Sequence, residues 1–486
     1  MANDWEGKSV LVLGLGDTGL SCIRWLAPRG ARLRAADTRE APPALGAVSA
    51  GFPAVRVELG AFDEALLAGV DAIAASPGIA LREPLLRAAV SRGIEVVGDV
   101  EIFAREVPHI APGARVLGIT GTNGKSTVTA LAGAMGRAAR FRTTVAGNIG
   151  LPVLDALREY GERARGASAE SDLFVIELSS YQLETTANLA LDAAAMLNVS
   201  QDHLDRYDSM QGYARAKERI FINAAARIVN RDDAWSRAMG GERPLSFGLG
   251  EPRSEREWGL DRAQAVLRRG DEDLLAVKDM GMQGLHNAAN ALAAHALVSS
   301  IGAPRAALDR AMREFKGLPH RVELVAELGG VRFYDDSKGT NLGASVAALQ
   351  GLRDPVVLIA GGDGKGQDFA PLAPAVKARA RAVVVIGRDG PAIAAALKAT
   401  GVPIERAESM RDAVNAAFAR ARPGDAVLLS PACASFDMFR NYAHRGDVFA
   451  ECVRNLGTGH NSTPDVPCPP TGHSSIPDVP NPPEEL

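Results

Sequence analysis

The segment Gly118–Thr127 contains the residues whose types and spacing point most directly to chemistry. It reads Gly-Ile-Thr-Gly-Thr-Asn-Gly-Lys-Ser-Thr, with Gly-Lys-Ser at the start of an expected helix. In such a turn, main-chain N–H groups surround phosphate oxygens, Lys125 reaches the β- and γ-phosphates, and the Ser126 hydroxyl binds Mg²⁺. The strict phosphate-loop pattern has a glycine where this chain has Ile119, but its functional end is intact. We therefore predict that a nucleoside triphosphate binds here.

A second glycine-rich turn, Gly14-x-Gly16-x-x-Gly19, lies between a short apolar strand and a helix. Glycines at this spacing let backbone N–H groups approach a pyrophosphate at the helix N-terminus. Asp37 ends the next expected strand, where a contact to a ribose or base is expected. The residues alone leave two interpretations open, a dinucleotide site and a tight turn without a ligand.

Other polar residues follow apolar segments that we expect to be strands. Glu177 follows Leu173–Ile176, and the segments Asp336–Asn341 and Gly361–Gly366 follow strands further along the chain. Ligands of α/β proteins bind at the carboxyl edge of the sheet. Glu177 is therefore either a metal ligand or a solvated residue at the edge, and each segment is either part of a site or a plain turn.

Four further residues indicate a function only if other residues of a site lie beside them. His203 and Lys217 would each be surface residues by default. Asn287 and Asn290 lie one helical turn apart, which suits bidentate recognition of adenine as well as helix capping.

The elements that must position these residues alternate between strand and helix. Apolar runs such as Ser9–Leu13, Arg115–Ile119 and Val356–Ala360 recur along the chain with helical patterns between them. Continuous apolar strands separated by helices predict parallel sheets with helices on both faces. At roughly 100–200 residues per domain, the chain of 486 residues should hold about three. We predict an α/β fold with a Rossmann-like N-terminal domain at 1–112, a P-loop ATPase-like central domain at 113–318 and a Rossmann-like C-terminal domain at 319–456.

Composition restricts the classes of function and sets the end of the chain apart. The formal net charge is −4, and residues 457–486 carry all of it, because they hold four acidic residues and no lysine or arginine. The first 456 residues are therefore neutral, which favours neither a nucleic acid nor an anionic membrane as a partner. Eight of the 28 prolines also follow Gly457, so we predict a disordered, Pro-rich tail at 457–486.

Cysteine usage and targeting signals point to the cytoplasm. The four cysteines include no Cys-x-x-Cys pair, so we expect small buried hydrophobic residues and not a disulfide framework. The segment Met1–Ser9 lacks the layout of a signal peptide. No apolar run approaches the ~18–20 residues of a membrane span, and we expect no membrane partner.

Taken together and in order, these segments resemble the Mur ligases, over about residues 5–455. The segments that carry the resemblance are Thr120–Ser126, Gly147-Asn148, Glu177–Ser180, Asn198–His203, His286–Asn290, Pro319–Glu323 and Asp336–Asn341. Four more segments are similar to those of the family members that add D-glutamate, namely Asp202–Tyr207, Gly361–Gly366, Ser430–Asp437 and Asn441–Asp447.

The resemblance implies an ATP-dependent ligase of peptidoglycan precursor synthesis. Such an enzyme joins the L-alanyl carboxylate of UDP-N-acetylmuramoyl-L-alanine to the amine of D-glutamate and releases ADP and phosphate. A carboxylate resists attack by an amine, so the family first converts it to an acyl phosphate, whose phosphate is a good leaving group. The resemblance further implies ATP, two Mg²⁺ ions and a monomer.

The resemblance also implies which residues bind each ligand. For ATP these are Gly121, Thr122, Asn123, Gly124, Lys125, Ser126, Thr127, Asn287, Asn290, Arg321, Asp336 and Lys338. For the UDP-linked substrate they are Gly14, Asp17, Thr18, Asp37, Thr38, Arg39, Ser76, Gly78, Asn148 and His203. For D-glutamate they are Thr340, Lys365, Ser435, Phe436 and Tyr442. For Mg²⁺ they are Ser126, Glu177, His203 and Lys217, the last only as a carbamate formed with CO₂. The implied catalytic residues are Lys125, Asn148, His203, Lys217 and Lys338.

Three alternatives stay open. A sibling ligase or a folylpolyglutamate-synthase-like enzyme would take a different amino acid. An NAD-linked oxidoreductase with an accessory NTPase domain would bind nicotinamide at the Gly14 turn, but it leaves Lys338 and Lys365 without a role. A non-catalytic nucleotide-sensing protein would have no need of the metal and lysine positions.

Overall fold

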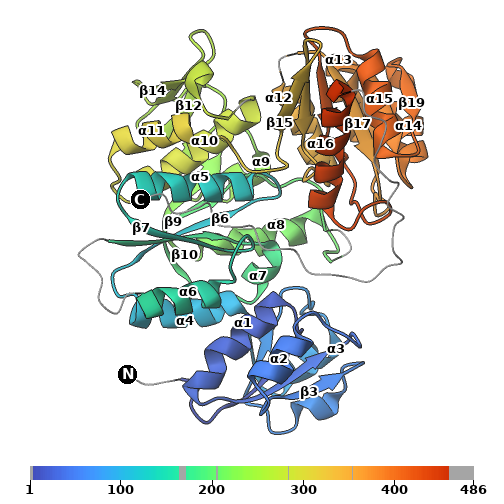
Figure 1. Cartoon of the computed structure of the whole chain (residues 1–486). Coiled ribbons are helices and arrows are strands. Elements are labelled where there is room, and N and C mark those ends of the chain that lie inside the picture. The colour runs from blue at the N-terminus through green and yellow to red at the C-terminus, as the bar shows by residue number, and fades with distance from the viewer. Residues whose placement is uncertain (1–3, 164–170, 204–205, 283, 353, 459–486) are drawn as a thin grey trace.

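The protein is described by a computed structural model that covers residues 4–163, 171–203, 206–282, 284–352 and 354–458. These residues form three α/β bodies that follow one another along the chain, each built on one sheet (Figure 1). In this view the first body lies below the second, and the third stands beside the second at the upper right.

The first body is a parallel sheet of five strands. Its strands are β1 (Ser9–Leu13), β2 (Arg32–Asp37), β3 (Arg56–Leu59), β4 (Ala72–Ala75) and β5 (Glu95–Val97), and its helices are α1 (Asp17–Leu26), α2 (Leu45–Gly51) and α3 (Pro84–Ser91). The strand order is β3-β2-β1-β4-β5. Along β1, Val10 and Val12 enter the core on one face of the sheet, and Leu11 and Leu13 enter the core on the other. The continuous apolar run is thus explained by burial on both faces.

The second body places the Gly-Lys-Ser turn at the middle of a nine-stranded sheet. Its strands are β6 (Arg115–Thr120), β7 (Arg142–Gly147), β8 (Asp172–Glu177), β9 (Ala190–Met196), β10 (Asn223–Asn230), β11 (Leu245–Phe247), β12 (Glu257–Asp261), β13 (Val266–Arg269) and β14 (Glu272–Ala276). The order is β14-β13-β12-β11-β10-β9-β6-β8-β7. The turn therefore leaves β6 between β8 and β9, whose ends carry other candidate residues. Only β12, β13 and β14 pair in antiparallel fashion among these strands.

Helices cover both faces of this second sheet (Figure 1). They are α5 (Lys125–Ala138), α6 (Val153–Arg163), α7 (Ser180–Glu184), α8 (Met210–Glu218), α9 (Ala234–Ala238), α10 (Leu285–Ser299) and α11 (Arg305–Glu314). Helix α4 (Asp99–Ile110) connects the first body to the second and packs against α6.

The third body brings three loops to one edge of a six-stranded sheet. Its strands are β15 (Glu323–Leu328), β16 (Val331–Asp335), β17 (Val356–Gly361), β18 (Ala380–Ile386), β19 (Ile404–Arg406) and β20 (Ala426–Leu429), and its helices are α12 (Leu342–Gly351), α13 (Ala373–Arg379), α14 (Gly390–Leu397), α15 (Met410–Arg420) and α16 (Tyr442–Thr458). The order is β15-β16-β20-β17-β18-β19. Strands β16, β20 and β17 are parallel neighbours. Because parallel strands end at the same edge, the loops after them lie side by side.

The predicted α/β class with parallel sheets is confirmed, with differences at particular segments. The Pro-rich tail was predicted from residue 457, but α16 includes Gly457 and Thr458; the rest of that prediction, 459–486, lies outside the described residues. Helix α4 also runs through Pro108, a proline that as a helix breaker would suggest a boundary.

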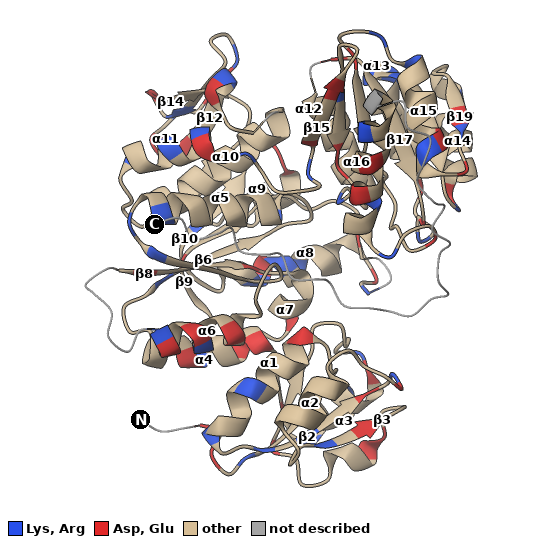
Figure 2. Cartoon of the chain, in the orientation of Figure 1, with Lys and Arg blue, Asp and Glu red and all other residues tan. Residues whose placement is uncertain are grey.

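None of the described helices is long and apolar enough to cross a membrane. Positively and negatively charged residues are mixed along the chain (Figure 2). Figure 2 shows lysine and arginine interspersed with aspartate and glutamate on α4 and α6, in the same orientation as Figure 1. On these helices neither sign of charge dominates.

Candidate active site

The turn between β6 and α5 has the backbone that a phosphate-binding loop requires. Gly121 has φ 154° and Gly124 has φ 84°, both in the region that favours glycine. A Cβ at Gly124 would lie 2.5 Å from Oδ1 of Asn290, which therefore sits directly against the loop. Asn290 Nδ2 donates to Oδ1 of Asn287 at 3.1 Å. The two amides on α10 thus form one unit beside the loop.

Lys125 is folded back over this loop. Its Nζ donates to the carbonyl oxygens of Gly121 at 2.8 Å and Thr122 at 2.9 Å. Burial lowers the pKa of Lys125. The lysine thus holds its own loop together.

Asn198, after β9, anchors the other side of the loop. Its Oδ1 accepts from the amide of Asn123 at 2.8 Å, and its Nδ2 donates to the carbonyl of Asn123 at 3.0 Å. The carbonyl of Asn198 also accepts from the amide of Thr122 at 2.8 Å. The loop is thus held in shape by a strand end that is its neighbour in the sheet.

Lys217 also contacts the loop and is almost fully buried. Its side chain is 2% exposed, and its Nζ donates to the carbonyl of Gly121 at 2.8 Å, the acceptor that Lys125 also uses. Burial first, and then the charge of Lys125, lower the pKa of Lys217 well below the usual value for lysine. The neutral amine is therefore favoured, and a neutral amine is a nucleophile.

Glu177 ends β8 beside these groups and has an unused oxygen. Glu177 is 2% exposed, and its Oε1 accepts a hydrogen bond from Nδ2 of Asn148 at 2.8 Å. Oε2 is buried without a hydrogen-bond partner among the described residues. A buried carboxylate oxygen without a partner is costly unless a cation or donor meets it. Together with the Ser126 hydroxyl it fits the oxygen ligands that Mg²⁺ prefers.

His203 lies in a cluster of aromatic rings next to Lys217. Its Nδ1 is 2.7 Å from the hydroxyl of Tyr181, and its backbone has φ 54°. Its ring centroid is 5.9 Å from that of Tyr213, and Nζ of Lys217 lies 4.6 Å from the same Tyr213 centroid. The structure thus places His203 and Lys217 on one tyrosine ring.

The third body reaches the phosphate loop through two side chains. Nη2 of Arg321 donates to Oγ of Ser126 at 2.8 Å. Nδ2 of Asn341 donates to Oδ1 of Asn123 at 3.2 Å and to Oδ2 of Asp202 at 3.4 Å. Residues of two bodies therefore meet at the helix N-terminus where the phosphates of ATP are expected.

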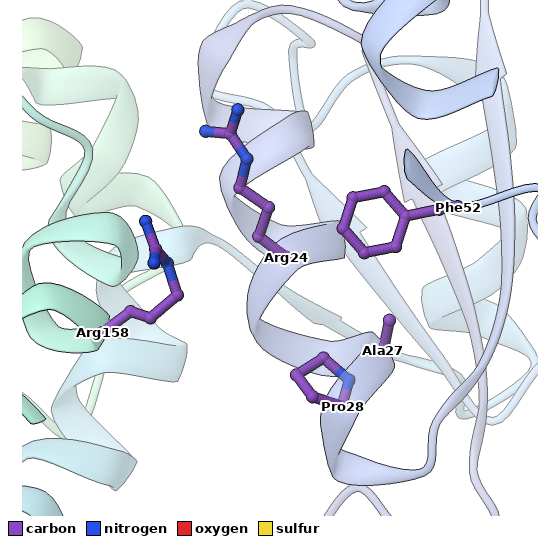
Figure 3. A pocket seen from close by; sticks show the side chains of 5 residues that line it. All are labelled: Arg24, Ala27, Pro28, Phe52 and Arg158. Carbon is purple, nitrogen blue, oxygen red and sulfur yellow. The ribbon is translucent and has the colours of Figure 1, made fainter. Parts of the chain in front are cut away.

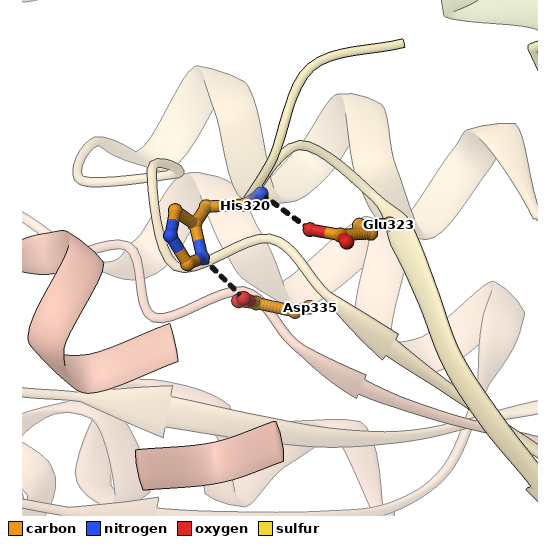
Figure 4. A group of neighbouring side chains, drawn as sticks. All are labelled: His320, Glu323 and Asp335. Carbon is orange, nitrogen blue, oxygen red and sulfur yellow. Dashed lines mark hydrogen bonds and ion pairs between the residues drawn. The ribbon is translucent and has the colours of Figure 1, made fainter. Parts of the chain in front are cut away.

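The residue before Arg321 in the linker, His320, contacts Glu323 and Asp335 (Figure 4). The residues on either side of Arg321, His320 with φ 62° and Val322 with φ 51°, both have left-handed backbones. The His320 amide donates to Oε2 of Glu323 at 2.9 Å, and its Nδ1 lies 2.7 Å from Oδ2 of Asp335. The hydrogen bond to Asp335 raises the pKa of His320. These contacts hold a backbone that non-glycine residues seldom adopt.

Lys338 and Asp336 occupy the loop after β16. Nζ of Lys338 lies 3.6 Å from the ring centroid of Tyr442, and burial lowers the pKa of this lysine to about 8. Asp336 accepts from Oγ of Ser430 at 2.6 Å, and burial raises its pKa to about 7. The amide of Lys338 donates to the carbonyl of His320 at 3.2 Å, so this loop and the Arg321 linker are joined.

The residues predicted for D-glutamate come from the neighbouring loops of the same sheet edge. Asp363 and Ala434 form a backbone bridge with N–O distances of 2.9 and 2.8 Å, which puts the Lys365 and Ser435 loops together. Lys365 has φ 50°, and its amide donates to Oδ1 of Asp363 at 2.9 Å. Phe436 is 57% exposed although it is a large apolar side chain. The ring of Tyr442 lies against Nζ of Lys338, and Thr340 is exposed in the loop after β16, which also carries Lys338.

In the first body the Gly14 turn and the β4 loop meet. Oγ of Ser76 donates to the carbonyl of Gly14 at 2.9 Å. Asp37 is already engaged, because Oδ2 accepts from the amide of Leu15 at 2.7 Å and both oxygens pair with the Arg39 guanidinium. Burial opposes the charge of Asp37, but the bonds from Arg39 and Leu15 lower its pKa to about 2. Asp17, Thr38 and Gly78 are exposed around this turn and Thr18 is half-buried.

A separate groove of about 720 Å³ opens between α1 and α6 (Figure 3). It is lined by Arg24, Ala27, Pro28, Phe52 and Arg158, none of which was predicted as a site residue. Nη1 of Arg24 pairs with Asp155 at 3.2 Å, and Nη1 of Arg158 pairs with Glu162 at 2.8 Å. Both arginines are thus paired with carboxylates, and the groove takes no part in the site described above.

Family models match all three bodies. Residues 8–98 match the N-terminal domain of MurD-like Mur ligases, 119–298 the Mur ligase middle domain, and 320–433 the Mur ligase glutamate ligase domain. The chain belongs to the Mur ligase family.

Relatives within the Mur ligases are similar over nearly the whole chain. The UDP-N-acetylmuramoylalanine–D-glutamate ligase of Methylobacillus flagellatus is 55% identical over 456 residues, which cover 93% of this chain and 98% of the relative. The ligase of the same name from Thiobacillus denitrificans is 52% identical and covers 93% and 97%.

Solved structures of Mur ligases and related enzymes share the fold at low identity. A pseudomurein peptide ligase type C from Methanothermus fervidus has 18% identity and a TM-score of 0.56, with 93% of this chain and 100% of that chain covered. The UDP-N-acetylmuramate–alanine ligase of Thermotoga maritima has 18% identity and a TM-score of 0.55, with 92% and 99% covered.

Membership of the Mur ligase family excludes one function that the sequence left open, and the structure adds three residues to the candidate site. The NAD-linked oxidoreductase is not retained, because the Gly14 turn lies within the matched MurD-like domain. Sequence reasoning assigned no role to Asn198, Tyr181 or His320. The position of Asn198 after a strand could have indicated a site residue. The left-handed backbone at His320 could not be predicted, because no glycine stands at that position in the sequence.

Proposed function

We propose that this Mur ligase joins D-glutamate to UDP-N-acetylmuramoyl-L-alanine and converts ATP to ADP and phosphate, as a step in peptidoglycan precursor synthesis. The observation that carries the proposal is the meeting of two bodies at the phosphate loop, where Nη2 of Arg321 lies 2.8 Å from Oγ of Ser126. The names of relatives at 55% and 52% identity support D-glutamate as the amino acid.

Positioning and charge are the main requirements of phosphoryl transfer to the substrate carboxylate. The amides of the phosphate loop and Lys125 would bind the β- and γ-phosphates, and Arg321 and Lys338 would approach from the third body. Asn287 and Asn290 would hold the adenine or ribose side. The acyl phosphate formed in this way is then attacked by the amine of D-glutamate, and phosphate leaves.

Magnesium would be held by Ser126 and Glu177, whose unpartnered Oε2 supports a cation there. When bound, it offsets the charge that develops as the γ-phosphoryl group moves. We further propose that His203 and Lys217 serve a second ion. An ammonium group cannot bind a cation, but the neutral Lys217 amine can add to CO₂, lose a proton and become a carbamate, which offers carboxylate-like oxygens.

The other substrates would bind on the flanking bodies. The Gly14 turn, Ser76 and Asp37–Arg39 would hold UDP, and Asn148 would lie by the reacting carboxylate. Lys365 would pair with a carboxylate of D-glutamate, together with Thr340, Ser435, Phe436 and Tyr442. From the resemblance to the family we propose a monomer, and a cytoplasmic one because ATP is consumed.

Phosphate release with defined substrates tests this function. The purified chain should release phosphate from ATP only when UDP-N-acetylmuramoyl-L-alanine and D-glutamate are both present. L-glutamate, L-alanine and a diamino acid are the matched controls. Equal stimulation by any of them would overturn D-glutamate specificity and favour a sibling ligase.

A further inference from the structure

Arg206 joins the first body to the second and has no role in the mechanism above. Its side chain is 8% exposed. Its guanidinium donates to the carbonyl oxygens of Gly78 and Ile79, each at 3.2 Å, and to Oε2 of Glu184 at 2.6 Å. One planar group therefore ties the loop after β4 to helix α7.

The loop that Arg206 holds belongs to the proposed UDP site. Ser76, at its start, donates to the carbonyl of Gly14 at 2.9 Å. Gly78 was itself predicted to contact the UDP-linked substrate. A ligand that orders this loop also orders the two carbonyls that Arg206 binds.

The other side of Arg206 lies on Tyr181, which is on the same short helix as Glu184. The guanidinium carbon is 4.4 Å from the centroid of the Tyr181 ring. The hydroxyl of Tyr181 is 2.7 Å from Nδ1 of His203, and the two ring centroids are 4.9 Å apart. Arg206 is thus two contacts away from the imidazole of His203.

A partner on Nδ1 matters for a histidine that is to bind a cation. Metal-binding histidines nearly always use their second ring nitrogen in a hydrogen bond, which fixes the orientation of the ring. With Nδ1 engaged by Tyr181, Nε2 of His203 is the ring nitrogen that would face a cation, beside Oδ2 of Asp202 at 3.7 Å. Loss of such a partner typically costs about 10–100-fold in metal affinity.

We propose that Arg206 and Tyr181 are positioning residues that couple binding of the UDP-linked substrate in the first body to binding of a divalent cation at His203 in the second. The proposal rests on the proposed function for its two ligands. Order in the Ser76–Ile79 loop fixes Arg206, Arg206 fixes the Tyr181 ring, and Tyr181 fixes His203. Substrate and cation then tighten each other by the same factor, as linkage requires.

The test measures this factor directly, without turnover. Binding of Mn²⁺ to the full chain is measured by electron paramagnetic resonance in the presence of a non-hydrolysable ATP analogue, with and without UDP-N-acetylmuramoyl-L-alanine. Calorimetric titration of the UDP-linked substrate with and without Mn²⁺ gives the reciprocal value. We expect about a 10-fold tightening for the unmodified chain, within the usual range of coupling.

Variants separate positioning from a purely structural role. Arg206→Ala should bring the coupling factor close to 1 while Mn²⁺ binding without the substrate changes little. Arg206→Lys should do the same, because an ammonium group has no planar fork for two carbonyls and a carboxylate. Tyr181→Phe, which keeps the ring and should fold, should weaken Mn²⁺ binding roughly 10-fold and also remove the coupling.

Arg82 provides the matched control. Its Nη1 lies 3.8 Å from Oδ1 of Asp208, and both side chains are largely exposed. This exposed ion pair bridges the same two stretches of chain and is not part of the contacts from Arg206 through Tyr181 to His203, so Arg82→Ala should keep the full factor. Coupling that survives in Arg206→Lys or Tyr181→Phe, or that is absent from the unmodified chain, would overturn the proposal. Failure of the proposed function would instead appear as no D-glutamate-dependent phosphate release by the unmodified chain.

Discussion

Two lysine side chains, Lys125 and Lys217, share the carbonyl oxygen of Gly121, each at 2.8 Å. Two ammonium groups at one acceptor repel each other, and burial adds to the cost of charge. The pKa of both lysines is lowered, and that of Lys217 well below its usual value. At the residue scale, then, the site favours one cation at the phosphates and one neutral amine.

Replacement of Lys217 tests the role of this amine. Lys217→Ala should lower the rate of ligation by more than about 10²-fold, because the oxygens proposed to hold the second cation are lost. Short carboxylic acids should restore part of the activity, and extra Mg²⁺ alone should restore little. Native mass spectrometry of the unmodified chain in bicarbonate should show one added CO₂ that Lys217→Ala lacks. Full activity of the variant without added acid would argue against the carbamate.

At the scale of elements, side chains hold the part of the linker between the second and third bodies that carries Arg321. His320 pairs with Asp335 at 2.7 Å and precedes Arg321, and both His320 and Val322 have positive φ. The hydrogen bond from Nδ1 is the side-chain contact of His320 that holds this backbone, beside the bond from its amide to Glu323.

Substitutions of His320 separate this hydrogen bond from other effects. His320→Asn keeps a donor near Nδ1 and should retain most of the activity. His320→Ala should lower kcat by roughly 10²-fold, the usual cost of a displacement of about 1 Å near the reacting groups. Equal losses in both variants would contradict the positioning role.

The same pair predicts a pH dependence of stability. The hydrogen bond to Asp335 raises the pKa of His320 in the folded chain. The folded chain then holds this proton more tightly than the unfolded one. The stabilising contribution is complete below the unfolded value of about 6.5 and is lost as the pH rises through the folded pKa. Denaturant unfolding across this window should show the loss in the unmodified chain and not in His320→Asn.

A glycine substitution tests the phosphate loop as an element. Gly124→Ala combines φ 84° with a Cβ placed 2.5 Å from Oδ1 of Asn290. Gly113→Ala is the control, with φ 82° and open space. Both should lose about 1–3 kcal/mol of stability to backbone strain. Only Gly124→Ala should also lose affinity for an ATP analogue in calorimetry, and an equal affinity in both variants would contradict the close fit of the loop.

The sequence predicted the buried parallel strands better than the short antiparallel strands and the contacts between bodies. Strand β1 was evident because its consecutive apolar residues enter two cores. Strands β12 to β14 were missed, because short antiparallel strands with polar residues show no continuous apolar run. Arg321 and Ser126 are 195 positions apart in the chain, so no local pattern encodes their contact. The resemblance to a family named both residues, but only the packed bodies show that they touch.

At the scale of the whole molecule, the net charge does not describe the site. All four units of formal negative charge lie beyond Thr458, since Asp465, Asp478, Glu484 and Glu485 account for −4. Removing residues 459–486 therefore takes the formal charge from −4 to 0, as −4 plus 4. Every proposed site residue precedes this segment.

Truncation after Thr458 tests whether the tail contributes to catalysis. The shortened chain should keep kcat and the KM values of all three substrates, and should elute earlier from an anion exchanger. A loss of more than about 10-fold in kcat/KM, near 1.4 kcal/mol, would show that the tail contributes to the site. The full chain prepared in parallel is the reference.

The folded-back position of Lys125 has a consequence for turnover. Nζ of this lysine donates to the carbonyls of Gly121 and Thr122, so the phosphate oxygens of a nucleotide compete with the protein's own backbone for its N–H donors. Part of the attraction between lysine and phosphate is thereby offset. The same competition should favour release of ADP, because the carbonyls of Gly121 and Thr122 can accept hydrogen bonds from the lysine when the product leaves.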